Sequence, residues 1–309
     1  MQIVVVGSLV TDLVTRLPRL PRVGETLMAE RSERHPGGKG MNQAVAAARF
    51  GADVAMVGRV GDDAFGADLI NVLDREGVGR EHVSPLAGAT TGYAVPMVLP
   101  GGNNAIILAP EANHLTSVRS VTVAQALITG AKALILQNEI PIESSIHAAE
   151  LARAAGVLVV ANPAPASRDV PQLARVSDWF IPNEIEAGQL TGIKVVDVDS
   201  AGRACRALLS GGVERGVIVT LGASGVVWAT KRASGHVPSL PVEAVDPTGA
   251  GDAFVGVFTA SYVMGAPLQD AILDGVAAGV LSTTRYGAQA ALPQGEEIRD
   301  AVSRLRTAH

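Results

Sequence analysis

Short runs rich in Val and Ile alternate along this chain with Ala-rich stretches of helical length. This alternation is typical of strands joined by crossover helices in a parallel sheet. The sequence therefore predicts an α/β fold with helices packed on a central, mostly parallel sheet. The expected strands cover residues 3–6, 54–57, 133–136, 157–161, 179–181, 217–220 and 226–229. The expected helices include residues 42–50, 64–76, 144–155, 200–209, 250–264 and 268–284.

Two segments, residues 11–35 and 91–108, lack a helical period. The second contains Pro100-Gly101-Gly102 between extended runs, which is typical of a β-hairpin turn. We expect these segments to form a small sheet outside the main layer, within a single domain that spans residues 1–309. Such a sheet could cover a pocket at the C-terminal edge of the parallel strands, where open α/β sheets bind their ligands.

Composition excludes several classes of protein. Hydrophobic residues make up 48% of the 309 residues and charged residues 18%, which indicates a folded chain with a substantial core. A net charge of -5 and the absence of a long Lys and Arg run argue against a nucleic-acid partner. Cys205 is the only cysteine, so an intrachain disulfide and a thiolate metal cluster are both impossible.

The first seven residues contain a short apolar run without a basic start or a cleavage site. No apolar stretch approaches the roughly 20 residues of a membrane span. We therefore expect a cytoplasmic protein with no membrane partner.

The run DPTGAGD, residues 246–252, places a carboxylate directly behind three small residues where an apolar helix is expected to begin. Gly249, Ala250 and Gly251 would leave the amides of a helix N-terminus uncovered, and such amides bind anionic oxygens. Asp252 could then take a proton from a hydroxyl held beside a phosphate. The run by itself is equally compatible with an ordinary turn and a capped, buried helix.

The run GGKGMNQ, residues 37–43, is a glycine-rich loop before another Ala-rich helix. It is not a Walker loop, because Gly rather than Ser or Thr follows the lysine. Lys39 and Asn42 offer hydrogen-bonding groups that suit a polyhydroxyl ligand, although a solvated turn is the better explanation of the loop taken alone. Asp12 and Glu139 each follow an expected strand, so both carboxylates should lie on the same rim of the sheet.

Two further motifs follow expected strands. NEIE at residues 183–186 could orient the waters of a Mg²⁺ bound to phosphates, and it could equally be a helix start capped by Asn183. TLGASG at residues 220–225 has glycines that would let a nucleotide approach the backbone. GAGDAFVG at residues 249–256 has the wrong glycine spacing for a dinucleotide fingerprint, which argues against a nicotinamide-dependent oxidoreductase.

Together these motifs resemble the ribokinase-like carbohydrate kinases. The similarity runs from GSLVTDL at residues 7–13 to TRYGAQ at residues 284–289, nearly the whole chain. Its most specific motifs are GGKGMNQA near residue 40 and DPTGAGDAF near residue 250, whose order and separation match the family. The GGKG form is similar to the ribokinase branch rather than to the fructokinase, adenosine kinase or ketodeoxygluconate kinase branches.

The resemblance implies a three-layer α/β/α fold with a small β-sheet lid at residues 11–35 and 91–108, and a homodimer formed through that lid. It implies ATP-dependent phosphorylation of D-ribose at its 5-hydroxyl to give D-ribose 5-phosphate, with Mg²⁺ and K⁺ as the ions. The sugar would be held by Asp12, Gly38, Lys39, Asn42 and Glu139. Asp252 would be the general base, beside an anion hole formed by the backbone of Gly249, Ala250 and Gly251.

The resemblance also implies binding sites for the nucleotide and for two ions. The nucleotide and its phosphates would contact Asn183, Thr220, Gly222 and Gly225. Glu186 would lie near Mg²⁺, through water. A monovalent cation, K⁺, would be bound at Asp246, Thr248, Ser282, Arg285 and Gly287.

Two positions depart from the family pattern. Many bacterial ribokinases have asparagine two positions before the sugar-binding aspartate, whereas this chain has Val10, whose side chain cannot form a hydrogen bond. Val276 stands near the adenine pocket, where some relatives have a polar residue. The alternatives are therefore a kinase for deoxyribose, another sugar or a nucleoside, and a sugar-binding sensor without turnover.

Overall fold

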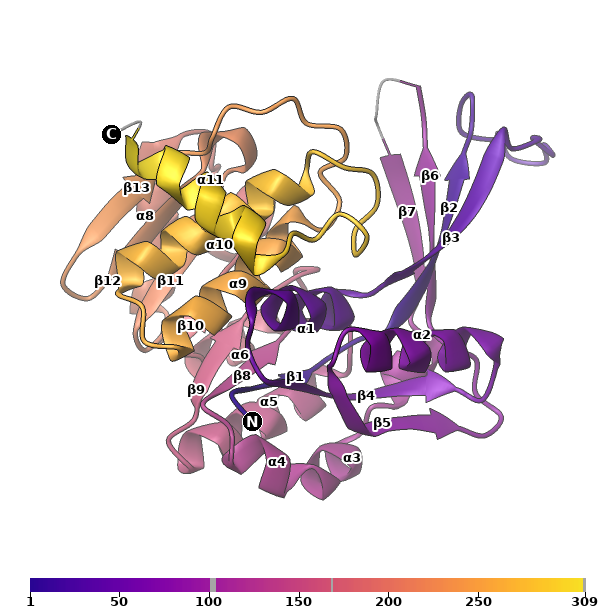
Figure 1. Ribbon diagram of the computed structural model, residues 1–309, viewed down its shortest axis with the longest axis horizontal. Coiled ribbons are helices and arrows are strands. Elements are labelled where there is room, and N and C mark those ends of the chain that lie inside the picture. Colours follow the sequence, from indigo (N-terminus) through magenta and orange to yellow (C-terminus); the bar gives the residue numbers. More distant parts are fainter. Residues whose placement is uncertain (101–103, 168, 308–309) are drawn as a thin grey trace.

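The computed structural model describes residues 1–100, 104–167 and 169–307, and its centre is a nine-stranded sheet (Figure 1). The strand order is β13-β12-β11-β10-β9-β8-β1-β4-β5. Neighbouring strands are parallel except that β12 is antiparallel to both β11 and β13. The strands are β1 (Ile3–Val6), β4 (Val54–Gly61), β5 (Gly79–Leu86), β8 (Ala133–Leu136), β9 (Leu158–Ala161), β10 (Trp179–Phe180), β11 (Gly216–Thr220), β12 (Val226–Thr230) and β13 (Ser234–Val237).

Helices cover both faces of this sheet, which confirms the predicted α/β fold. Ile3 and Val5 of β1 join one buried cluster while Val4 and Val6 join the other, as expected for a strand covered on both sides. The first cluster includes buried residues of five helices, α1 (Lys39–Phe50), α2 (Ala64–Arg75), α9 (Ala250–Val263), α10 (Leu268–Ser282) and α11 (Gly295–Thr307). The second contains α3 (Val118–Val123), α4 (Gln125–Thr129), α5 (Ile142–Ala154), α6 (Val170–Arg175), α7 (Glu184–Thr191) and α8 (Val198–Ser210). Two short 3-10 helices are η1 (Glu111–Leu115) and η2 (Gly222–Ser224).

A second sheet of four strands projects away from this body (Figure 1). Its order is β3-β2-β6-β7, and β2 pairs with β6 in parallel while the outer pairs are antiparallel. The strands are β2 (Val10–Arg16), β3 (Arg31–Gly37), β6 (Tyr93–Val98) and β7 (Asn104–Ala109). The two segments predicted to leave the main layer therefore pair with each other. Gly101 and Gly102 of the predicted hairpin turn lie outside the described residues.

The order of the strands reverses between β1 and β8. From β1 the chain adds β4 and β5 on one side, whereas β8 begins the series that extends to β11 on the other side. Ligands of open α/β sheets bind in the crevice beyond such a reversal. Over the described residues, none of the helices combines the length and the apolar character that crossing a bilayer requires.

Candidate active site

Glycines let three segments meet beyond the C-terminal ends of β1 and β8. A Cβ added to Gly7 would lie 2.0 Å from Gln137 Oε1, and a Cβ added to Gly40 would lie 2.6 Å from the Ser8 nitrogen. The backbone amide of Met41 donates to the Ser8 carbonyl at 3.0 Å, and the amide of Gly40 donates to Ser8 Oγ at 3.2 Å. The start of α1 is therefore fixed against the crevice where the strand order reverses.

Glu139 joins the glycine-rich loop to the segment that follows β8. Its Oε2 accepts hydrogen bonds from Ser8 Oγ at 2.5 Å and from the backbone amide of Lys39 at 3.0 Å. Gly38 precedes α1 with a φ of 91°, and a Cβ there would lie 2.9 Å from the Val10 nitrogen. Glu139, Gly38 and Lys39, which the sequence places in two distant motifs, are thus neighbours.

Asp12 reaches this group from the second sheet. It lies on β2 opposite His35 of β3, and its carboxylate packs so closely on Gly37 that a Cβ there would lie 2.3 Å from Asp12 Oδ2. Burial raises the pKa of Asp12 to about 7, with further contributions from the negative charges of Glu139 and Asp252. Asp12 therefore belongs to the same electrostatic cluster as the two carboxylates of the body.

Asp252 is the third residue of α9, which begins after Gly249 in a left-handed conformation with a φ of 82°. Its side chain is buried, Oδ2 accepts from Asn42 Nδ2 at 3.0 Å, and Oδ1 accepts from Gln43 Nε2 at 2.9 Å. The first amides of a helix have no acceptor within the helix, so the start of α9 is suited to bind an anion. The amide of Ala250 donates to the Pro247 carbonyl at 3.2 Å, so the amides of Gly251 and Asp252 are the better candidates for that anion.

Lys39 lies among carboxylates. Burial lowers the pKa of its ammonium group, but the charges of Asp252, Glu139 and Glu186 raise it by more. Burial in turn raises the pKa of Glu139 and of Glu186, while Lys39 partly offsets this rise at both residues. Lys39 is therefore held as a cation among buried acids, where it can donate to oxygen atoms of a bound ligand.

Asn183 and Glu186 form a capping box at the start of α7. Asn183 Oδ1 accepts from the Glu186 amide at 2.8 Å, and Glu186 Oε2 accepts from the Asn183 amide at 2.9 Å. Asn183 also forms an isolated parallel bridge with Thr220, the last residue of β11. The prediction that Asn183 caps a helix is confirmed, and the bridge to Thr220 places the NEIE motif beside the segment expected to contact the nucleotide.

The segment after β11 turns sharply at two glycines. Gly222 has a φ of 52°, and a Cβ on it would meet no other atom within 4 Å. Gly225 has a φ of 83°, and a Cβ there would lie 2.1 Å from the Val237 carbonyl oxygen. The fold therefore requires glycine at residue 225, whereas there is free space beside the backbone at Gly222.

Val276, the other position that departs from the family pattern besides Val10, is buried in α10 within the first core cluster.

Two loops meet at the position predicted for the monovalent cation. Asp246 Oδ1 accepts from the Thr248 amide and its Oδ2 from the Gly287 amide, each at 3.0 Å. Ser282 is buried at the end of α10 and its Oγ donates to the Gly279 carbonyl at 2.8 Å. Arg285 forms an ion pair with a glutamate of α11, so its guanidinium is engaged there. Both carboxylate oxygens of Asp246 are thus occupied by backbone amides and hold the two loops together.

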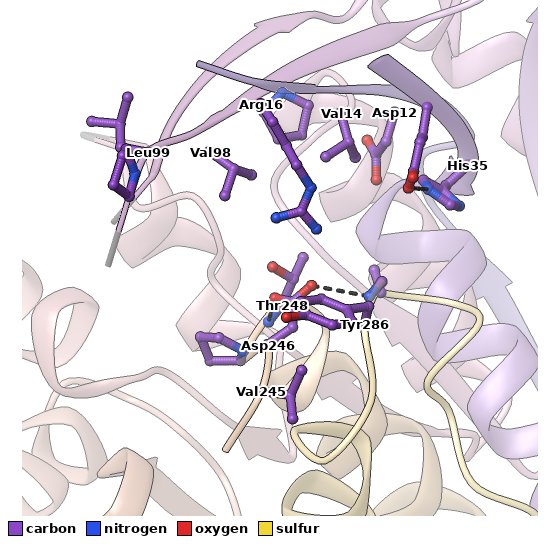
Figure 2. A pocket seen from close by; sticks show the side chains of 16 residues that line it. Asp12, Val14, Arg16, His35, Val98, Leu99, Val245, Asp246, Thr248 and Tyr286 are labelled. Atoms are coloured by element: carbon purple, nitrogen blue, oxygen red, sulfur yellow. Dashed lines mark hydrogen bonds and ion pairs between the residues drawn. The ribbon is translucent and has the colours of Figure 1, made fainter. Parts of the chain in front are cut away.

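A cavity of about 460 Å³ separates the second sheet from these loops (Figure 2). Asp12 and Arg16 project into it from β2, and Asp246, Thr248 and Tyr286 face them from the opposite wall (Figure 2). The Arg16 guanidinium lies 5.3 Å from the centre of the Tyr286 ring, so a cation-π contact bridges the two walls. Asp252 does not line the cavity, whereas Asp12, which belongs to the same electrostatic cluster, does.

The chain matches known carbohydrate kinases over most of its length. The model of the pfkB family carbohydrate kinases matches residues 1–295. The chain belongs to this family. It is 36% identical over 304 residues to a deoxyribokinase of Salmonella typhi, covering 98% of this chain and 99% of that protein. It is 38% identical over 293 residues to a ribokinase of Haemophilus influenzae, covering 95% of each.

The fold of this kinase also matches solved structures. The ribokinase of Arabidopsis thaliana, in a structure complexed with ribose and ATP, superimposes with a TM-score of 0.87 and 30% identity, covering 97% of this chain and 98% of that one. The predicted ribokinase-like fold is therefore confirmed. Membership of the family makes the chain a phosphotransferase with an alcohol group as acceptor.

The kinase has three site residues that the sequence analysis did not assign a role. Gln43, Gln137 and Asn162 are buried amides that lie next to one another behind Asp252. A signal for all three was present, because Gln43 ends the GGKGMNQ motif, while Gln137 and Asn162 directly follow β8 and β9, as Glu139 follows β8. Their neutral side chains carry no charge pattern, and their contacts join segments far apart in the sequence.

Proposed function

We propose that this kinase transfers the γ-phosphoryl group of ATP to the 5-hydroxyl of a pentose, with D-ribose as the first substrate to test. The observation that carries the proposal is the position of Asp252. This carboxylate lies at an anion-binding helix start and contacts Asn42 of the glycine-rich loop at 3.0 Å. The ribose and ATP bound in the structure of the Arabidopsis relative support this choice of substrates.

In the proposed reaction, Asn42, Lys39, Glu139 and Asp12 orient the sugar hydroxyls. Asp252 takes the proton of the attacking hydroxyl while the amides at the start of α9 stabilise charge on the transferred phosphoryl group. The second sheet closes over the sugar and excludes water. Catalysis then rests on positioning and electrostatics rather than on a covalent intermediate.

The donor set at α7 fits a magnesium ion held mainly by phosphates. The described residues include no group of three or more His, Cys, Asp or Glu side chains that could hold a metal by itself. Mg²⁺ is commonly bound through one or two carboxylates, water and substrate phosphates, and Glu186 is the carboxylate beside Lys39 and the nucleotide segment. Bound there, Mg²⁺ would neutralise charge on the phosphates.

We further propose K⁺ at backbone oxygens of the two loops around Asp246, Thr248, Ser282, Arg285 and Gly287. The loops are held together by Asp246, whose amide also donates to the Thr283 carbonyl at 3.1 Å. A cation there would act on the conformation of the adjacent anion hole. Turnover measured with KCl and with an equal concentration of tetramethylammonium chloride tests this assignment.

Replacement of Asp252 by Asn tests the central assignment. The change keeps the size of the side chain and removes the base, so turnover should fall by about 10² or more while ATP binding persists. ATP affinity is measured by titration calorimetry and turnover by a coupled ADP-release assay. A D252N variant with turnover close to that of the wild type would refute the role of Asp252, and binding of ribose without turnover by the wild type would favour a sensor.

A second candidate acceptor, 2-deoxyribose, is favoured by Val10. This side chain is buried, and its Cγ2 would lie 3.2 Å from a Cβ on Gly38, so it packs directly against the glycine-rich loop. A methyl group there cannot hydrogen-bond a hydroxyl, and it leaves no polar group unpaired when the hydroxyl is missing. The likeness to the deoxyribokinase of Salmonella typhi is consistent with this reading. Specificity constants for ribose, 2-deoxyribose, other pentoses and nucleosides decide between the two.

A further inference from the structure

Amide side chains surround the carboxylate of Asp252 on its buried side. Asn42 and Gln43 are consecutive residues of α1, and each donates to a different oxygen of Asp252, at 3.0 and 2.9 Å. The two helices come close enough for this because of Gly256, where a Cβ would lie 2.5 Å from the Gln43 carbonyl oxygen. The approach of α1 to α9 therefore determines where the carboxylate points.

The orientation of the Gln43 amide is determined by its partners. An ionised carboxylate only accepts hydrogen bonds, so the NH₂ end of Gln43 must face Asp252. The oxygen end accepts from Gln137 Nε2 at 2.7 Å, and the second proton of Gln43 Nε2 is donated to Asn162 Oδ1 at 3.1 Å. If the amide rotated by half a turn, Gln43 Oε1 would face two acceptor oxygens, those of Asp252 and Asn162. Its Nε2 would face the side-chain nitrogen of Gln137, so all three hydrogen bonds would be lost.

The network ends on the central sheet. Asn162 follows β9, and its Nδ2 donates to the Ile181 carbonyl at 2.8 Å. Gln137 follows β8 and is fully buried, as is Gln43, while Asn162 and Asp252 are 8% and 6% exposed. Buried hydrogen bonds of this kind are strong because the surroundings are poorly screened, and they confine their members to one arrangement.

We propose that Gln43, oriented by Gln137 and Asn162, is a positioning residue that aims the Asp252 carboxylate at the acceptor hydroxyl. The inference rests on the proposed function, in which Asp252 is the base. Each carboxylate oxygen accepts one amide proton and keeps a further lone pair that can take the proton of the acceptor hydroxyl. Asn42 contributes differently, because its Oδ1 is buried without a partner among the described residues and can accept a sugar hydroxyl.

The position of the base affects turnover more than it affects sugar binding. A displacement of about 1 Å at a reacting group can lower the rate about 10²-fold. Gln43→Met, which keeps the length of the side chain and removes the amide, should lower kcat roughly 10- to 100-fold while the sugar KM changes less than about threefold. Gln137 forms a hydrogen bond to Gln43 and none to Asp252, so Gln137→Met should lower kcat about 3- to 10-fold by letting the Gln43 amide rotate.

The test measures Q43M and Q137M in wild-type and in D252N backgrounds, with thermal unfolding of every variant. If Gln43 acts through the carboxylate, Q43M and Q137M should change the residual kcat of D252N by less than about twofold, because no carboxylate is left to aim. Ser144→Ala is the matched control. Ser144 lies on α5, and its Oγ donates a buried hydrogen bond to the Thr116 carbonyl at 2.7 Å. Loss of this hydrogen bond should leave kcat within about twofold of the wild-type value.

Two results would overturn the inference. In the first, Q43M lowers kcat by the same factor with and without Asp252, as a general loss of folding would. In the second, D252N is inactive but Q43M and Q137M turn over like the wild type. Failure of the proposed function looks different, because D252N itself would then remain active. Should Q43M fail to fold, Q137M in the two backgrounds gives the same decision.

Discussion

Replacement of Asp12 by Asn should stabilise this kinase at alkaline pH while weakening its hold on the sugar. The half-buried carboxyl group of Asp12 lies near Glu139 and Asp252, and its pKa is raised from 3.8 to about 7. Between about pH 4 and pH 7, the folded protein therefore keeps a proton that the unfolded chain has already released. Wild-type stability falls as the pH rises through this window, and the loss is complete above about pH 7.

The magnitude follows from the size of the shift. A rise of roughly 3 pH units at 1.36 kcal/mol per unit corresponds to about 4 kcal/mol when Asp12 is charged in both states. Solvent reaches part of this half-buried side chain, so we expect an effect of about 2–4 kcal/mol. The neutral amide that D12N introduces avoids this penalty. The difference in unfolding free energy between D12N and the wild type should therefore grow from about a quarter of this value at about pH 4.5 to the full value at about pH 8.5.

The assay is urea unfolding of D12N and of the wild type between about pH 4.5 and 8.5, at constant ionic strength. Asp63→Asn is the control. Burial raises the pKa of Asp63, but hydrogen bonds from Thr91 and from the Gly66 amide lower it by more, so the net shift is downward. A lowered pKa contributes stability that is lost only as the pH falls through that pKa, below about 4. D63N should therefore be less stable than the wild type by a constant amount across the measured range.

A D12N difference that stays flat across this pH range would refute the reasoning, because it would mean that burial does not penalise the charged carboxylate. Ribose binding by D12N, measured by calorimetry at about pH 8, should be weaker than that of the wild type by about tenfold or more. A gain in stability together with a loss of affinity is expected when a charged side chain serves ligand binding and destabilises the folded protein.

Three further predictions concern other parts of the site. Gly249→Ala should lower the unfolding free energy by about 1–2 kcal/mol, because Gly249 has a φ of 82° and its Cβ would lie 3.1 Å from Ala288 Cα, whereas thermal unfolding of Gly251→Ala should match the wild type. Val10→Asn should raise the ratio of specificity constants for ribose over 2-deoxyribose about tenfold, since it supplies a hydrogen bond that only the 2-hydroxyl can use. Ile107 is 58% exposed on the edge strand β7, so if the second sheet joins two copies, Ile107→Lys should convert a dimer to a monomer in light scattering, and an unchanged mass would contradict the proposed interface.

The sequence predicted the fold best where strands are buried on both faces. The strands at residues 3–6 and 133–136 were predicted with the bounds the structure has, because their apolar runs are continuous. The edge strands β5 and β13 were not predicted, since Gly79–Leu86 and Ser234–Val237 mix exposed and half-buried residues and contain few consecutive apolar ones. Pairing between the two segments of the second sheet also depends on the tertiary fold, which local patterns do not contain.

The site was predictable where residues stand at the ends of strands or in glycine-rich loops. Lys39, Glu139 and Asp252 were expected on separate grounds, and the structure brings them into one electrostatic cluster. The amides behind Asp252 could not be assigned from sequence, because glutamine and asparagine are mostly found on solvated surfaces and their presence alone does not indicate a buried network. The positioning role of Gln43 is seen only in the structure, where groups from three separate segments determine the orientation of its side-chain amide.

The charges of the cluster explain why positioning amides are useful in this kinase. Lys39 is the cation among Asp252, Glu139 and Glu186, and any of these carboxylates would be drawn towards its ammonium group. In the proposed mechanism, a shift of the Asp252 carboxylate towards Lys39 would change its position relative to the acceptor hydroxyl. Hydrogen bonds from two neutral amides hold the carboxylate of Asp252 without adding charge, so they orient the base while Lys39 stays available to the ligand. A second lysine or arginine in place of these amides would add another positive charge that attracts the carboxylate of Asp252, whereas neutral donors orient it without that effect.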